Sequence, residues 1–310
     1  MPELPEVEVV RLFLNSHLIG KTISNLEIIS PKSFSGDPKK IINQKIIKTS
    51  RIGKQLSLHL ANNFILLFHL KMTGQIIYSP PSSKGTPNLR EGVSTLGHPT
   101  PLHSFSEGWP NKSTRLVFTF SDKSQLFFND QRKFGWVKLL TPDELFDYQK
   151  NLGLDVLSSK FTSKYFYNQI ENTSRPIKTV LLDQNKFAGI GNIYANDALF
   201  LAKINPSTSS NKINLKKSEL LVHFLKKIMM DSIKAGGSTA KDNKYIHPDG
   251  SAGTHQFSFQ VYQRNNEPCL VCQTPIKRIK IGGRGTFYCP KCQKYSRSVK
   301  GDARRTEGLI

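Results

Sequence analysis

The stretch Cys269-Leu-Val-Cys272-Gln-Thr-Pro-Ile-Lys-Arg-Ile-Lys-Ile-Gly-Gly-Arg-Gly-Thr-Phe-Tyr-Cys289-Pro-Lys-Cys292 contains all four cysteines of the chain. They form two Cys-x-x-Cys pairs with sixteen residues between them, and each pair can present two thiolates to one metal ion. The segment between the pairs, with Gly282-Gly283 at its centre, is typical of two short strands joined by a tight turn. The spacing therefore predicts a zinc ribbon in which one structural Zn²⁺ is bound by Cys269, Cys272, Cys289 and Cys292.

Two disulfides are the alternative use of these cysteines. Disulfides require an oxidising compartment, and the first twenty residues lack the basic-then-apolar pattern of a secretion signal. The longest apolar run, Phe64–Phe68, is too short to cross a bilayer. We therefore expect a soluble protein of the cytoplasm with no membrane segment, a setting that favours zinc.

The charge of the chain predicts a polyanionic partner. The chain has 44 Lys and Arg residues against 23 Asp and Glu, which gives a net charge of +21. Basic residues recur along the chain among apolar ones rather than forming a tail. A basic surface that only aids solubility is the alternative, but combined with a basic zinc ribbon the charge favours nucleic acid as the partner.

The periodicity of apolar residues divides the chain of 310 residues into three parts. Alternation predicts strands over Thr22–Ser30, Lys45–Leu60, Asn63–Ser79, Arg115–Ser121 and Gln125–Asp130, and a segment rich in Pro, Ser, Gly and Thr predicts a long surface loop over 80–113. Helical spacing follows in Ile177–Asp183, Ile193–Ala202 and Leu215–Ala235. We expect an α+β protein with an N-terminal antiparallel β-sandwich and flanking helices over 1–144, a helical domain over 145–255, and a zinc ribbon with a basic tail over 256–310.

The first residues, Met1-Pro2-Glu3-Leu4-Pro5-Glu6, carry a candidate catalytic group. Removal of Met1 would leave Pro2 with a free secondary amine whose ordinary pKa, about 8, lies below that of lysine, about 10.4. Such an amine is nucleophilic at neutral pH, and Glu3 and Glu6 lie beside it as acid or base groups. The alternative is ordinary helix-start chemistry, in which proline and acids are favoured.

Five motifs in this order resemble those of the formamidopyrimidine-DNA glycosylases, bacterial enzymes that excise oxidised purines. Besides the opening residues up to Glu8 they are Arg51-Ile-Gly-Lys54, His69-Leu-Lys-Met-Thr-Gly74, Asn129-Asp-Gln-Arg-Lys-Phe-Gly135, Gly189-Ile-Gly-Asn-Ile-Tyr-Ala195 and the end of the ribbon. The resemblance implies that Pro2 attacks C1′ of the damaged nucleotide and that Glu3 assists opening of the sugar ring and proton transfer. It assigns Glu6 a supporting role, and it places Lys54 on a β-hairpin and Arg284 at the ribbon tip, each reaching phosphates around the lesion. An exposed strand lysine is the alternative for Lys54.

The same resemblance assigns residues that hold DNA. Met72, Arg132 and Phe134 match side chains that fill the space left by an extruded nucleotide and contact the orphaned partner base. The alternative places Met72 and Phe134 in a core. Lys178 and Asn192 match phosphate-binding residues of a helix–two-turn–helix domain, although Asn192 alone is also explained as a helix N-cap.

The resemblance implies a bifunctional DNA glycosylase and abasic-site lyase that acts as a monomer on double-stranded DNA in the bacterial cytoplasm or nucleoid. Its lesions would be oxidised purines, such as 8-oxoguanine and formamidopyrimidines, or abasic sites. The alternatives are an endonuclease VIII-type enzyme for oxidised pyrimidines and a non-catalytic lesion-binding protein. Residues Asp242–Gln256 resemble a loop that covers the extruded purine, in an altered form.

Overall fold

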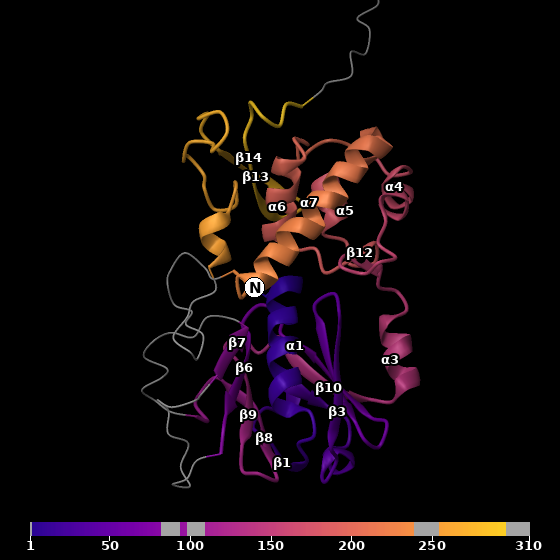
Figure 1. The fold of residues 1–310 in the computed structure, drawn as a ribbon, viewed down its shortest axis with the longest axis vertical. Helices are drawn as coiled ribbons and strands as arrows, with labels where there is room; N and C mark the ends of the chain where they lie inside the picture. Colours follow the sequence, from indigo (N-terminus) through magenta and orange to yellow (C-terminus); the bar gives the residue numbers. More distant parts are fainter. Residues whose placement is uncertain (1, 82–93, 98–108, 239–253, 296–310) are drawn as a thin grey trace, which may run out of the picture.

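The computed structural model describes residues 2–81, 94–97, 109–238 and 254–295. Figure 1 shows a β-sandwich at one end of the molecule and a helical domain at the other, with a two-stranded hairpin beside the helices. Helix α1 (Leu4–Leu18) begins beside the helical domain and runs along the sandwich. This arrangement confirms the predicted α+β fold of sandwich, helical domain and ribbon.

The sandwich consists of two five-stranded sheets with the strand orders β1-β8-β9-β6-β7 and β2-β10-β5-β4-β3. Strand β2 pairs with β10 in parallel, and the other pairs of both sheets are antiparallel. The first sheet contains β1 (Ile23–Ile28), β6 (Gly74–Ser79), β7 (Ser94–Gly97), β8 (Thr114–Phe120) and β9 (Gln125–Asp130). The second contains β2 (Phe34–Ser35), β3 (Ile46–Ile52), β4 (Gln55–Leu60), β5 (Ile65–His69) and β10 (Trp136–Leu140). The short helices η1 (Pro31–Ser33) and η2 (Pro38–Ile41) flank β2.

Apolar side chains from both sheets and from α1 form the core of the sandwich. Phe68 lies in contact with Phe118 and Phe128 of the facing sheet, and all three rings are buried. Burying a side chain of this size contributes about 1.5–3 kcal/mol. Tight turns join β4 to β5 and β8 to β9, where Asn63 and Lys123 adopt positive φ values of 67° and 70° between the paired strands.

The prediction of a long surface loop over 80–113 is wrong in two places. Residues Ser94–Gly97 form β7, which pairs with β6 at the edge of the sheet. Trp109 packs in a small core cluster with Ile77, Val117 and Phe127. A four-residue edge strand is defined by its backbone pairing rather than by an apolar pattern, so periodicity does not reveal it. The rest of the predicted loop, 82–93 and 98–108, lies outside the described residues.

The helical domain surrounds a second core. Helix α3 (Pro142–Gln149) precedes this domain and packs against β5 and β10 of the sandwich. The elements of the helical domain are β11 (Leu154–Asp155), α4 (Ser163–Ile170), α5 (Ile177–Leu181), β12 (Phe187–Ala188), α6 (Asn192–Leu201), η3 (Ser210–Lys212), α7 (Leu215–Lys234) and η4 (His255–Ser258). Helix α7 ends where predicted, because Gly236 and Gly237 adopt left-handed φ values of 75° and 88° directly after it. Leu4 packs in this core, whereas Val7 and the later apolar residues of α1 pack in the sandwich, so α1 joins the two domains.

The ribbon hairpin consists of β13 (Lys277–Ile281) and β14 (Arg284–Tyr288), and it confirms the predicted strands. Gly282 and Gly283 form its tight turn with φ values of 55° and 76°. Cys269, Ile276, Phe287 and Cys289 pack against Phe200 of α6. Within the described part of the chain, no helix has the length and apolar character needed to cross a membrane.

Candidate active site

A cavity of ≈ 310 Å³ lies where α1, the sandwich, the helical domain and the ribbon meet. It brings together five residues singled out in the sequence, Pro2, Lys54, Met72, Asn192 and Arg284. The other residues that line it are His69, Lys71, Leu182, Gln184 and Gly191. The fold therefore brings residues from several separate sequence motifs together at one cavity.

Glu3 is held against the first turn of α6. Its carboxylate Oε1 accepts a hydrogen bond of 3.1 Å from the backbone N–H of Ile193, which is favourable at a helix N-terminus. Within the described residues, Oε2 is buried and has no hydrogen-bond partner. Burial raises the pKa of Glu3, with the nearby charge of Lys54 acting in the opposite direction. The free oxygen and the raised pKa suit a carboxyl group that holds a proton.

Glu6 anchors the segment that carries Pro2 and Glu3. Its Oε2 accepts from the backbone N–H of Glu3 at 2.8 Å, and its Oε1 accepts from the hydroxyl of Tyr194 at 2.6 Å. The same oxygen also accepts from the backbone N–H and the hydroxyl of Ser238. Glu6 therefore supports the geometry of Glu3 through bonds to α6 and to the segment that follows α7, and Tyr194 is a partner that has no signal in the sequence.

Lys54 lies in the turn between β3 and β4 and is half-buried rather than exposed. Its Nζ donates to the backbone oxygen of Ile190 at 3.0 Å. Burial lowers the pKa of Lys54, although the charges of Glu3 and Glu6 partly oppose the effect. The alternative of a solvated strand lysine is therefore wrong.

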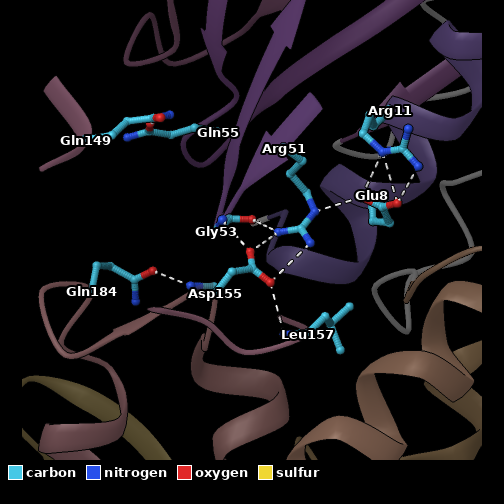
Figure 2. A network of polar contacts seen from close by, with 10 residues as sticks. Glu8, Arg11, Arg51, Gly53, Gln55, Gln149, Asp155, Leu157 and Gln184 are labelled. Carbon is cyan, nitrogen blue, oxygen red and sulfur yellow. Dashed lines mark hydrogen bonds and ion pairs between the residues drawn. The ribbon is translucent and has the colours of Figure 1, made fainter. Parts of the chain in front are cut away.

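A network of charged side chains holds the Lys54 turn against the helical domain (Figure 2). Arg51 donates to Glu8 at 2.8 Å and to Asp155 at 2.5 Å, and only 7% of its side chain is exposed. Asp155 also accepts from the backbone N–H of Gly53 at 2.7 Å. Gly53 has a φ of 57°, and a Cβ there would lie 3.1 Å from that of Ala188, so the turn needs glycine. Asp155 thus connects the start of the helical domain to the residue that precedes Lys54.

Asn192 and Arg284 face the cavity from α6 and the ribbon. Gly191, not Asn192, is the N-cap of α6, so the N-cap explanation of Asn192 is wrong. The side-chain amide of Asn192 instead donates to the backbone oxygen of Gly285 at 3.1 Å, which ties α6 to the ribbon tip. Arg284, at the start of β14, is exposed.

Lys178 does not line the cavity and is fully buried. Its Nζ donates to Asn196 Oδ1 at 2.8 Å and to Thr286 Oγ1 at 3.4 Å, so it links α5, α6 and β14. Burial lowers the pKa of Lys178 to about 7. Because of these two hydrogen bonds, the amine of Lys178 contacts protein groups in this structure, unlike the amine of an exposed phosphate-binding lysine.

Met72, Arg132 and Phe134 lie together on two loops at the edge of the sandwich. Arg132 Nη1 approaches the sulfur of Met72 at 3.2 Å, and its guanidinium lies 5.0 Å from the centre of the Phe134 ring. Met72 is 36% exposed and Phe134 is 53% exposed. The alternative that places these two side chains in a core is therefore wrong.

The four cysteines converge as the spacing predicts. Their sulfur atoms all lie within 4.8 Å of one another, and all four cysteines are free. Four tetrahedral ligands at a Zn–S distance of about 2.3 Å imply sulfur separations of roughly 3.8 Å, close to the 3.4 Å and 3.9 Å found here. The residues fit one zinc ion, and the two-disulfide alternative is wrong.

Two further residues, one in the cavity and one near the ribbon, were assigned no role from the sequence. His69 lines the cavity, and its Nδ1 accepts from the backbone N–H of Lys71 at 3.0 Å. Burial and the neighbouring lysines lower its pKa to about 3, so the ring is neutral and carries its proton on Nε2. Asp197 accepts three backbone N–H bonds, from Gln260, Val261 and Tyr262, and thereby holds the segment that leads to the ribbon. His69 is the first residue of the motif His69–Gly74, and this is the feature of the sequence that could have indicated its place in the site.

Comparison with known proteins gives matches along most of the chain. Residues 1–137 match the formamidopyrimidine-DNA glycosylase N-terminal domain, and residues 152–244 match the H2TH domain of the same glycosylases. Residues 266–294 match a zinc finger found in FPG and IleRS. The formamidopyrimidine-DNA glycosylase of Ureaplasma parvum is 35% identical over 300 residues, covering 94% of this chain and 100% of the relative. That of Listeria monocytogenes is 36% identical over 301 residues, covering 95% and 100%.

Solved structures agree with these sequence matches. A mutant of the Lactococcus lactis Fpg bound to Fapy-dG containing DNA is similar, with a TM-score of 0.80 and 31% identity over 95% of this chain and 100% of that one. The Lactococcus lactis Fpg bound to abasic-site DNA has the same TM-score, identity and coverage. With three domain matches in the order seen here and relatives aligned over nearly their whole length, the chain belongs to the formamidopyrimidine-DNA glycosylase family.

Proposed function

We propose that the protein is a bifunctional DNA glycosylase and abasic-site lyase that excises oxidised purines, including 8-oxoguanine and formamidopyrimidines, from duplex DNA. The observation that carries the proposal is the single cavity in which Pro2 lies beside Lys54 and Arg284, with Glu3 against the first turn of α6. Similar proteins have been solved with Fapy-dG and abasic-site DNA, which supports the substrate class.

Pro2 is the proposed nucleophile once Met1 has been removed. Its secondary amine attacks C1′ of the damaged nucleotide, and the N-glycosidic bond breaks with its electron pair leaving on the base, which takes up a proton. Glu3, whose pKa is raised by burial, donates a proton to the ring oxygen as the sugar opens. The product is an iminium ion that has no nitrogen proton to lose and therefore acts as an electron sink.

Strand cleavage follows from that iminium ion. Loss of a proton from C2′ expels the 3′ phosphate by β-elimination, and a second elimination expels the 5′ phosphate. Water then hydrolyses the iminium and releases Pro2. Lys54 and Arg284 supply positive charge for the phosphates around the lesion.

The remaining residues hold distorted DNA in the proposal. Asn192 and Lys178 bind phosphates, for which Lys178 must leave Asn196. Met72, Arg132 and Phe134 fill the space left by the extruded nucleotide and contact the partner base. Zinc bound by the four cysteines keeps the ribbon tip rigid and takes no part in the reaction.

The proposed division of labour follows three parts of the chain. Residues 1–144 carry the chemistry, 145–255 bind the backbone, and 256–310 clamp the lesion. The enzyme acts as a monomer on DNA in the bacterial cytoplasm or nucleoid. The predicted lesion-covering loop, 242–256, falls mostly outside the described residues, which end at Ser238 and resume at Thr254.

An endonuclease VIII-type activity on oxidised pyrimidines is the second candidate. A Lactococcus lactis Fpg has been solved with DNA that contains an oxidised pyrimidine, so such lesions enter the test. Leu4 and the set of Met72, Arg132 and Phe134 favour the purine enzyme. The presence of Pro2, Glu3 and Lys54 argues against a non-catalytic lesion-binding protein.

Borohydride trapping tests the proposal, because reduction converts the iminium ion to a stable covalent complex. The substrates are duplexes with 8-oxoguanine opposite cytosine, thymine glycol or a plain abasic site, and intact mass verifies that Met1 is absent. Trapping on 8-oxoguanine that is lost in Pro2→Gly is the expected result. Trapping on thymine glycol alone would indicate the pyrimidine activity, and trapping on no duplex would leave a binding protein.

A further inference from the structure

The side chains proposed above to insert into DNA, those of Met72, Arg132 and Phe134, are held in position by the loops that carry them. Met72 lies on the loop between β5 and β6, whereas Arg132 and Phe134 lie on the loop between β9 and β10. Apart from their contacts with one another, all three are exposed. The geometry that they share must therefore come from the backbone of the two loops.

Asp130, the last residue of β9, connects these loops. It is fully buried, and its carboxylate accepts from the hydroxyl of Thr73 and from the backbone N–H groups of Arg132, at 3.2 Å, and Gly135, at 2.5 Å. The three donors are the residue after Met72, Arg132 itself, and the residue after Phe134. The Thr73 hydroxyl oxygen also accepts from the N–H of Arg132 at 3.1 Å, which closes the link between the loops.

The loop backbones are shaped to meet this carboxylate. Lys71 and Lys133 adopt left-handed φ values of 51° and 59°, which are strained for lysine and need support from neighbouring contacts. A Cβ on Gly135 would lie 2.8 Å from the Phe128 ring and 3.1 Å from Asp130 Oδ2, so glycine allows the close approach. A Cβ added to Gly74 would lie 2.3 Å from the backbone oxygen of Leu70, so glycine allows a close approach there as well.

We propose that Asp130, through Thr73, is a positioning residue that fixes Met72, Arg132 and Phe134 relative to one another and thereby controls how the enzyme reads the base opposite the lesion. The inference rests on the proposed function, since it assigns the three side chains to inserted DNA contacts. Charge-assisted bonds from a buried carboxylate to backbone N–H groups are strong and directional, which suits such a role. Because Asp130 is fully buried, it is assigned a positioning role and no DNA contact.

The test compares variants that keep the shape of each side chain. Asp130→Asn replaces one acceptor oxygen by a donor, and Thr73→Val removes the hydroxyl, whereas Thr73→Ser keeps it and is the matched control. Single-turnover rates of the full chain are measured on lesion duplexes with cytosine or adenine opposite the lesion. A single-stranded abasic oligonucleotide, which has no opposite base, reports on the Pro2 chemistry alone.

We expect Asp130→Asn and Thr73→Val to reduce the preference for cytosine over adenine by roughly tenfold, because a well-placed arginine contact discriminates between bases by about 1–3 kcal/mol. The single-strand rate should change less than about twofold, and Thr73→Ser should keep the preference of the wild type. An equal fall on every substrate with a lower Tm would reduce Asp130 to a purely structural residue and overturn the inference, as would an unchanged preference.

If the wild type cuts none of these substrates, the proposed function fails. The positioning role of Asp130 is then tested by DNA affinity. The affinities of the same variants for duplexes with a stable abasic analogue opposite cytosine or adenine replace the rates. A preference in the wild type that disappears in Asp130→Asn and Thr73→Val but persists in Thr73→Ser supports the positioning role. Equal affinities for both duplexes in the wild type contradict it.

Discussion

The carboxylate of Glu3 accepts a hydrogen bond from the backbone N–H of Ile193, a residue 190 positions further along the chain. This contact seats the N-terminal segment on the first turn of α6 and sets the position of the neighbouring Pro2. Gly191 makes it possible, because a Cβ there would lie 2.0 Å from Glu3 Cδ.

Replacing Gly191 by alanine should therefore displace Glu3. A shift of about 1 Å in a reacting group can cost roughly 100-fold in rate, and we expect a loss of that size in single-turnover cleavage. Gly285→Ala is the matched control, since its Cβ would meet only ordinary contacts of 3.7 Å or more. Full activity in Gly191→Ala, with an unchanged Tm, would contradict the placement of Glu3.

Asp155→Asn should disturb the Lys54 turn at the domain boundary. Breaking a buried ion pair typically costs about 3 kcal/mol, so we expect a fall of this order in the free energy of unfolding. The cleavage rate should also fall, roughly 10-fold or more, because Gly53 and Lys54 lose their support. Urea unfolding with single-turnover kinetics measures both.

Asp147→Asn provides the control for this charge change. Asp147 pairs with Lys150 on the surface, with side chains 67% and 53% exposed. Exposed pairs contribute about 0–1 kcal/mol, so stability should change little. Equal effects of the two substitutions would show that the Arg51–Asp155 contact has no special role.

Removal of zinc should abolish tight DNA binding while leaving the sandwich folded. The ribbon core around Cys269 and Cys289 is separate from the sandwich core, and four thiols cannot hold the two Cys-x-x-Cys turns together without metal. Circular dichroism and DNA affinity, measured before and after chelation and again after zinc is restored, check this. Loss of all secondary structure on chelation would show that the sandwich does not fold independently of the zinc-bound ribbon.

Lys178→Met should change how stability depends on pH. The folded pKa of Lys178 is about 7, below the ordinary 10.5, because of burial. Between those two pH values the unfolded state binds more protons than the folded state, so stability rises with pH through this window. The neutral methionine should remove that rise, as urea unfolding at about pH 7.5 and about pH 9.5 would show. An identical rise in both proteins would mean that Lys178 is not the group responsible.

DNA affinity should fall steeply with salt, because each phosphate contact releases counterions. Arg284→Ala should reduce the slope of log affinity against log salt by about one. A similar reduction in Lys178→Met would support the proposed phosphate role of Lys178, whereas an unchanged slope would show that it stays with Asn196. A flat salt dependence of the wild type would contradict all the phosphate roles.

Local patterns in the sequence predicted much of the fold because neighbouring residues determine them. The spacing of the cysteines, the glycine pair at the ribbon turn and the glycine pair after α7 each specify backbone geometry within a few residues. Strand β7 was missed because four residues at a sheet edge are too short for a periodic pattern, so only the pairing with β6 defines the strand. The burial of Lys178 was missed for the same reason, since Asn196 and Thr286 are distant in sequence.

The sequence by itself determined the zinc ligands, the ribbon hairpin, and the order of sandwich and helices. These follow from chemistry and from spacing over a few residues. Only the tertiary structure decided that Glu3 meets Ile193, that Arg51 meets Asp155, and that Asp130 joins two loops. Such contacts depend on how whole domains pack, and packing brings together residues whose separation in the chain carries no local signal.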